Sequence, residues 1–95
     1  MSAAAVIIIQ QRRAIRRYEE AGARSPETAR RPDELGCRES WAFRRLVTRG
    51  VLRELPDGRL HLDADGVRRY EERLRFARGV VVLLLVAGLA LALLL

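Results

Sequence analysis

The 17 residues from position 79 to position 95 carry no polar side chain, because they are eight Leu, four Val, three Ala and two Gly. Leu and Val each favour membrane insertion by about 0.3–0.6 kcal/mol at a helix centre. A helix of this length reaches about 26 Å, slightly less than a hydrocarbon core of about 30 Å, and Phe76 and Ala77 extend the apolar stretch. A helix that is apolar on all sides must be surrounded, and the other 78 residues are too few to do so. The segment is therefore predicted to be a single transmembrane anchor at the C-terminus.

Arginines gather just before this segment, and no charged residue lies within it. Positively charged residues that flank a transmembrane helix stay on the cytoplasmic side. We therefore expect a tail-anchored protein whose N-terminal body is cytoplasmic and whose membrane-lipid contacts include five arginines at the interface. These are Arg68, Arg69, Arg73, Arg75 and Arg78.

Two small residues of the tail, Gly88 and Ala92, are four positions apart and share one face of a helix. Small residues at this spacing allow two transmembrane helices to approach closely. The pair makes a homodimer through the tail a candidate assembly.

The N-terminus carries a second apolar run, Ala3–Ile9, which is too short to span a bilayer. It is predicted to begin a helix that continues to about Ala21, with Tyr18 on its buried stripe. Arg12 and Arg13 follow the run and lack neighbouring acids, so phospholipid headgroups are the nearest anion for them. The run either lies in the membrane interface or packs on the tail of a neighbouring copy.

The body in front of the tail is basic and too small for a deep cleft. All 18 basic residues are Arg, and 12 acids leave a net charge of +6. Arg forms bidentate bonds with phosphate, so nucleic acid, anionic lipid and acidic protein are all admissible partners. One Cys and one His exclude an internal disulfide and the common zinc sites. Because no nucleophile–base pair, metal-ligand cluster or phosphate-binding glycine loop occurs, we expect no catalysis, no metal and no cofactor.

Turn and capping signals divide the body into elements. Ser25-Pro26-Glu27 predicts a helix start, which Pro32 interrupts. Phe43, Leu46 and Val47 predict the buried stripe of a further helix. The expected elements after the N-terminal helix are a helix over 38–49, strands over 51–55 and 60–62, and a helix over 64–78 that runs on into the tail.

Three stretches, DELGC at 33–37, FRRLVTRGVL at 43–52 and DGRLHLDADG at 57–66, carry a resemblance to a known fold. Over about residues 23–70 the chain resembles the winged helix-turn-helix domain of bacterial regulators such as the MarR-like group. The resemblance implies a small winged-helix-like body with one β-hairpin. Together with the predicted anchor, this gives a mainly α protein with a C-terminal transmembrane helix in the bacterial inner (plasma) membrane. The implied segments are an amphipathic helix (1–24), the winged-helix-like domain (25–66), a basic juxtamembrane helix (67–78) and the anchor (79–95).

The resemblance also implies a function. In DNA-binding members the second helix of the motif enters the major groove and the wing touches phosphate. The chain is then a membrane-tethered DNA-binding regulator, although winged helices also serve as protein-interaction modules and a membrane-bound adaptor is an alternative. A further alternative is a small membrane protein of unknown function whose Arg-rich body coats anionic lipid. With the last helix running into the bilayer, the wing is expected near the headgroups. The residues carried over as DNA contacts are Arg38, Ser40, Trp41, Arg44, Arg45 and Arg59.

Overall fold

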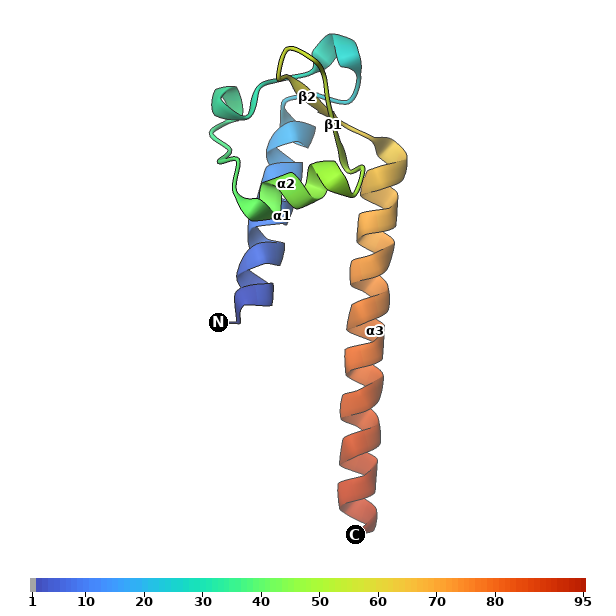
Figure 1. The fold of residues 1–95 in the computed structure, drawn as a ribbon. Helices are drawn as coiled ribbons and strands as arrows, with labels where there is room; N and C mark the ends of the chain where they lie inside the picture. The colour runs from blue at the N-terminus through green and yellow to red at the C-terminus, as the bar shows by residue number, and fades with distance from the viewer. Residues whose placement is uncertain (1) are drawn as a thin grey trace.

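The computed structural model describes residues 2–95; Met1, the first residue of the predicted 1–24 segment, lies outside them. The chain is mainly helical, as predicted, with one β-hairpin (Figure 1). The α-helices are α1 (Ala3–Glu20), α2 (Trp41–Thr48) and α3 (Ala64–Leu94), and the strands are β1 (Leu52–Glu54) and β2 (Leu60–Leu62).

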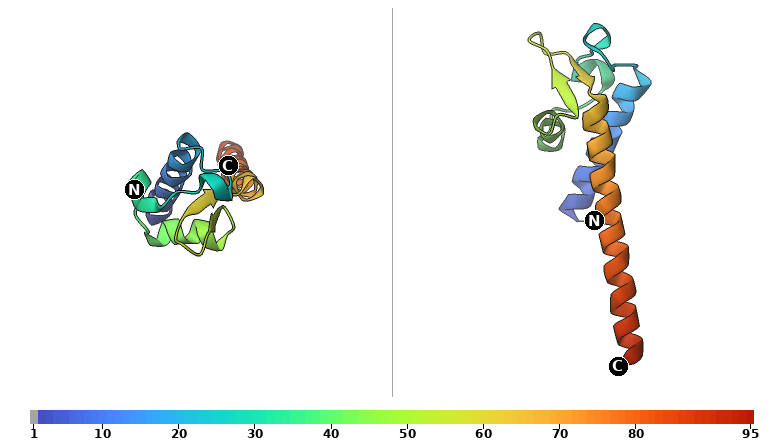
Figure 2. Two further views of the ribbon diagram at one scale, coloured as in Figure 1. Left: turned by 90° about the horizontal axis from the view of Figure 1, so that it is seen from above. Right: turned by 90° about the vertical axis from the view of Figure 1, so that its right-hand side faces the viewer.

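Helix α3 is one continuous helix of 31 residues that leaves the body and projects far beyond it (Figure 2). Each residue of its apolar part, from Gly79 onward, is exposed. The helix is long and apolar enough to cross a membrane. The predicted continuity between the last helix of the body and the apolar segment is confirmed.

The core of the body forms where α1 crosses α2 and the hairpin. Tyr18 of α1 is fully buried, and its ring centroid lies 6.3 Å from that of Phe43. Leu46 of α2 and Leu60 and Leu62 of β2 complete the same cluster. The helical spacing of these side chains thus predicted the buried faces of α1 and α2 correctly.

The hairpin is a short antiparallel pair in which Leu52 faces Leu62 and Glu54 faces Leu60. Gly58 closes its turn with φ +89°, a conformation that favours glycine. Figures 1 and 2 both show the hairpin tip pointing away from the apolar part of α3. The expectation that the wing lies near the headgroups is therefore wrong, because β2 runs from the tip directly into the start of α3 and leaves the tip at the opposite end.

The helix expected from Ser25 is only a single 3-10 turn, Pro26–Thr28. The Thr28 hydroxyl accepts the backbone N–H groups of Arg24 and Ser25, which closes the turn on itself. The chain then becomes extended, and Arg30 pairs with Leu60 beside the hairpin. A second short 3-10 turn, Pro32–Leu35, follows.

Helix α2 begins at Trp41 rather than at the expected position 38. Ser40 caps it, with its hydroxyl accepting the backbone N–H of Phe43 at 3.2 Å. A serine in this position satisfies an N–H group that has no partner within the helix. Arg38 therefore precedes the helix instead of lying on its outer face.

The start of α3 is fixed by a cap and a close backbone contact. The Asp63 carboxylate accepts the backbone N–H of Gly66 at 2.9 Å. Gly66 packs directly on the backbone of Gly50 and Val51, and a Cβ at position 66 would overlap the Gly50 carbonyl oxygen. Glycine is required here by this approach, which sets where α3 leaves the body.

Candidate functional site

Three of the residues predicted to contact DNA, Trp41, Arg44 and Arg45, lie on the outer side of α2, which we call the α2 surface, and Arg59 lies on the adjacent hairpin. Trp41, the only tryptophan in the sequence, stands at the start of α2, and its side chain is 64% exposed. The Arg45 guanidinium lies 5.3 Å from the centroid of its ring. An arginine over an aromatic face is a favourable cation–π arrangement, so the two side chains form one exposed unit.

Two of the predicted phosphate-binding arginines are already engaged by acids of the body. Arg44 donates through both Nη atoms to Glu54 at 3.3 and 3.4 Å, and this hydrogen bonding raises the pKa of Arg44. Arg59 lies 2.6 Å from Asp57 in the hairpin turn. The Asp57 carboxylate also accepts the Arg59 backbone N–H, which lowers the pKa of Asp57. The α2 surface is thus a mixed-charge surface rather than a basic one.

The remaining two predicted contacts, Arg38 and Ser40, lie in the loop before α2. The Ser40 hydroxyl is occupied as the helix cap. Cys37 beside them is half-buried against the core, as expected for a packing thiol, and burial raises its pKa. On α1 across from this loop, Arg17 donates to the Leu35 carbonyl at 2.8 Å and holds the loop in place.

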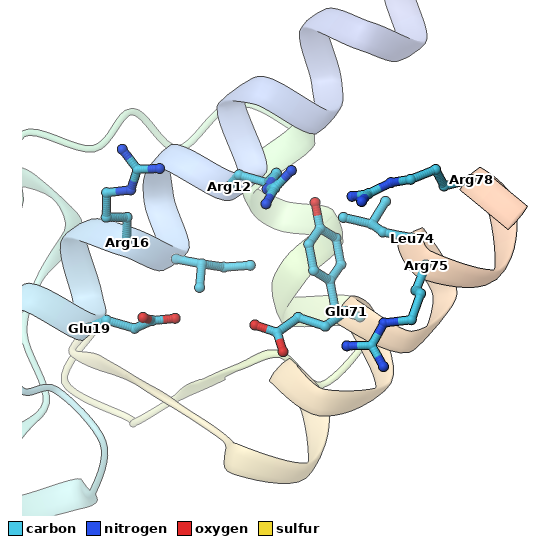
Figure 3. Close-up of a pocket in the computed structure, with 9 residues that line it drawn as sticks. Arg12, Arg16, Glu19, Glu71, Leu74, Arg75 and Arg78 are labelled. Atoms are coloured by element: carbon cyan, nitrogen blue, oxygen red, sulfur yellow. The ribbon is translucent and has the colours of Figure 1, made fainter.

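Apart from the α2 surface, a hollow with a volume of about 360 Å³ lies between α1 and α3. We call it the α1/α3 groove; it is shown in Figure 3. Its base is apolar, with Ile15 from α1 and Leu74 and Tyr70 from α3. The charged side chains that line it are Arg12, Arg16 and Glu19 from α1 and Glu71, Arg75 and Arg78 from α3.

Within residues 2–95, none of the four groove arginines has a carboxylate within 4.0 Å. Glu71 and Arg75, four positions apart on α3, form no ion pair within 4.0 Å, and Arg68 pairs with Asp65 at 2.8 Å. The groove therefore holds four cationic side chains against two anionic ones, with no direct neutralisation between them.

A hydrogen bond ties the walls of the groove together. The Tyr70 hydroxyl donates to Oε1 of Gln11 at 3.2 Å, and Nε2 of Gln11 donates to the Ala42 carbonyl at 3.1 Å. Gln11 thereby joins α1 to both α2 and α3. Burial raises the pKa of Tyr70, while Arg12 and Arg73 act in the opposite direction.

The charges in the groove are unevenly placed. Figure 3 shows Arg12 and Arg78 extending toward one another across the groove, with Glu19 and Glu71 at the other end. Because α1 and α3 run antiparallel, the Arg12–Arg78 end is the one nearest the apolar part of α3 (Figures 1 and 3). Sequence reasoning had assigned Arg75 and Arg78 to the membrane interface and headgroups to Arg12, but it did not join them into one hollow.

The other ionisable groups of residues 2–95 do not form a metal-binding cluster. Among residues 2–95, no three His, Cys, Asp or Glu side chains are placed to hold a metal ion. His61 is buried in β2, where its Nδ1 lies 3.1 Å from the Leu62 carbonyl oxygen. Asp63 serves as the cap of α3. No protein-family model, curated protein or solved structure matches the chain.

Proposed function

We propose that the chain is a small membrane-anchored adaptor that presents the α2 surface to a protein partner. The apolar part of α3 supplies the anchor. The flanking arginines favour a cytoplasmic body in a bacterial inner membrane, because basic residues at the end of a transmembrane helix remain on that side. Neither a catalytic step nor a cofactor is part of this proposal.

The observation that carries the proposal is the exposure of Trp41, 64%, with Arg45 stacked on its ring. Trp and Arg are the residues most enriched among those that dominate binding energy at protein interfaces. The Arg44–Glu54 pair beside them provides hydrogen-bonding groups of both signs, which suits the polar rim of a protein contact.

A membrane-tethered DNA-binding regulator with a winged-helix-like body is the second candidate. Two observations favour it. Arg38 is exposed, and no carboxylate of the described chain lies within 4.0 Å of it. The hairpin tip points away from the apolar part of α3 (Figure 1), so a duplex on the α2 surface need not approach the bilayer.

One experiment separates the candidates. Photoreactive benzoylphenylalanine is placed at Thr48 of the full chain in bacterial cells, which is exposed on the same face of α2 as Trp41 and leaves Trp41 and Arg45 intact, and at the exposed Glu20 of α1 as the matched control. We expect a discrete adduct from position 48 that protease destroys and nuclease leaves intact, with none from position 20. A nuclease-sensitive adduct supports the DNA candidate. Equal or absent adducts at the two positions would contradict both.

A further inference from the structure

The α1/α3 groove lies at the boundary between the polar and apolar parts of the molecule. Arg78 at its edge is the last charged residue before the apolar stretch of α3. The N-terminus of α1 extends toward the same level of α3, as both side views show (Figures 1 and 2). The apolar run of α1 comes down with it, and Val6 and Ile9 are 40% and 43% exposed. If the tail crosses a bilayer, the basic end of the groove meets the headgroup layer.

The charge arrangement of the groove fits a phosphate. Arg12 and Arg78 reach toward one another from opposite walls, while the two glutamates lie at the far end (Figure 3). Guanidinium groups form short, bidentate, charge-assisted bonds with phosphate oxygens. Because the four groove arginines have no carboxylate partner within residues 2–95, their hydrogen-bonding capacity is available to an external anion.

The exposed apolar run of α1 beside the groove distinguishes a lipid from a free ion. Ile15 and Tyr70 line the hollow but are each only 6% exposed, whereas Leu74 is half-buried. Val6 and Ile9, earlier on α1 than Arg12, present exposed apolar surface. A ligand with an anionic head at the arginines and an apolar body along this run matches both parts.

We propose that the α1/α3 groove is a binding site for the headgroup of an anionic phospholipid, with Arg12 and Arg78 holding the phosphate. The apolar run of α1 then lies in the membrane interface beside the bound lipid. This site rests on the proposed anchoring of α3 and is independent of whether the α2 surface binds protein or DNA.

The test uses the full chain in zwitterionic micelles, titrated with phosphatidylglycerol, with phosphatidylcholine and with inorganic phosphate. The readout is the NMR shift of the arginine Nε–Hε groups. We expect saturable shifts of Arg12 and Arg78 with phosphatidylglycerol only. Saturable shifts of equal size with inorganic phosphate would overturn the assignment to a lipid, and so would shifts of similar size with phosphatidylcholine.

Variants locate the site. Arg12→Gln/Arg78→Gln should weaken phosphatidylglycerol binding about tenfold or more, since two charge-assisted contacts are lost. Arg24→Gln/Arg49→Gln removes the same charge outside the groove and should change the affinity less than about twofold, as expected for screened surface charges. Equal weakening in the two variants would show that binding is diffuse and would contradict the proposal.

A third variant should raise the affinity for phosphatidylglycerol instead of lowering it. Glu71→Gln removes a negative charge from the groove, so phosphatidylglycerol should bind more tightly. Unchanged or weaker binding would count against the site. Flotation of the chain with vesicles of phosphatidylcholine alone tests anchoring separately: flotation without selective lipid binding overturns only the groove, and loss of flotation overturns the anchor.

Discussion

The arginines of the α2 surface and those of the α1/α3 groove differ in what lies opposite them. On the α2 surface and hairpin, Arg44 meets Glu54, Arg59 meets Asp57, and Arg53 lies 3.2 Å from Asp63. In the groove, the structure pairs none of the four arginines with a carboxylate of residues 2–95. Under the two proposals, the internally matched α2 surface would bind a partner through shape and Trp41, whereas the groove would bind through an anion from outside.

The origin of the difference is geometric. Asp57 sits two residues before Arg59 within one turn, and β1 brings Glu54 beside α2, so local chain structure supplies the acids. In the groove, the antiparallel course of α1 and α3 sets Arg12 of one helix opposite Arg78 of the other (Figure 3). Like charges are thus brought together by the tertiary fold and not by neighbours in sequence.

The largest expected effect comes from Gly66→Ala, which breaks the arrangement that creates both regions. The added Cβ would overlap the backbone of Gly50 and Val51, which cannot move as a flexible side chain can. We expect the body to lose about 3 kcal/mol of unfolding free energy, at the upper end for overpacking. The unfolding free energy is measured by urea titration in micelles, with the NMR signals of the hairpin amides as the readout. Gly79→Ala, with no heavy atom within 4 Å of its Cβ, is the control and should not destabilise.

Tyr70→Phe should have a smaller effect and should act on the groove alone. It removes the hydrogen bond to Gln11 and should cost about 1 kcal/mol, the usual contribution of such a bond. Tyr18→Phe is a matched control, because that hydroxyl donates to the Arg30 carbonyl at the same distance of 3.2 Å but lies away from the groove. Unfolding titrations should show similar losses, while phosphatidylglycerol affinity should fall only for Tyr70→Phe. A fall for both would mean that the groove is not a separate unit.

The smallest expected effect is a loss of stability in acid. Protonation of the carboxylates leaves the arginines of the α2 surface and hairpin without anionic partners, as the groove arginines already are. The Gly66 N–H and Arg53 lower the pKa of Asp63, and Arg59 lowers that of Asp57. Carboxylates with folded-state pKa values below those of the unfolded chain stabilise the fold above about pH 4, and this contribution is lost as pH falls through the folded values. NMR titration of the carboxyl carbons, with melting temperatures between about pH 5 and pH 2, measures this. Asp63→Asn should flatten the dependence, and an unchanged slope would contradict the assignment.

Much of the fold follows from local sequence signals. Helical spacing placed Tyr18, Phe43 and Leu46 in the core, and the two strands expected over 51–55 and 60–62 form the hairpin. The local prediction failed at Ser25, because pairing of Arg30 with Leu60 draws the chain into an extended form after one turn. That competing contact spans thirty positions and has no local signature.

The candidate sites were predictable to different extents. The exposed Trp41 and the arginines around it could be located from the position of α2 in the sequence. The carboxylate partner of Arg44 could not be predicted from the sequence. Several acids lie nearby along the chain, and only the register of the hairpin places Glu54 beside Arg44. The groove depends on the contact between Gln11 and Tyr70, which are 59 positions apart, and no periodicity in the sequence predicts it.

The continuity of α3 has a mechanical consequence. One unbroken helix runs from the Gly66–Gly50 contact to Leu94, so it has no joint at which the membrane part could turn independently of the body. A transmembrane helix adjusts its tilt to the thickness of the bilayer around it. With α3 as a membrane anchor, the body would tilt together with the helix in a membrane of different thickness, and the direction in which Trp41 faces would report on the lipid environment.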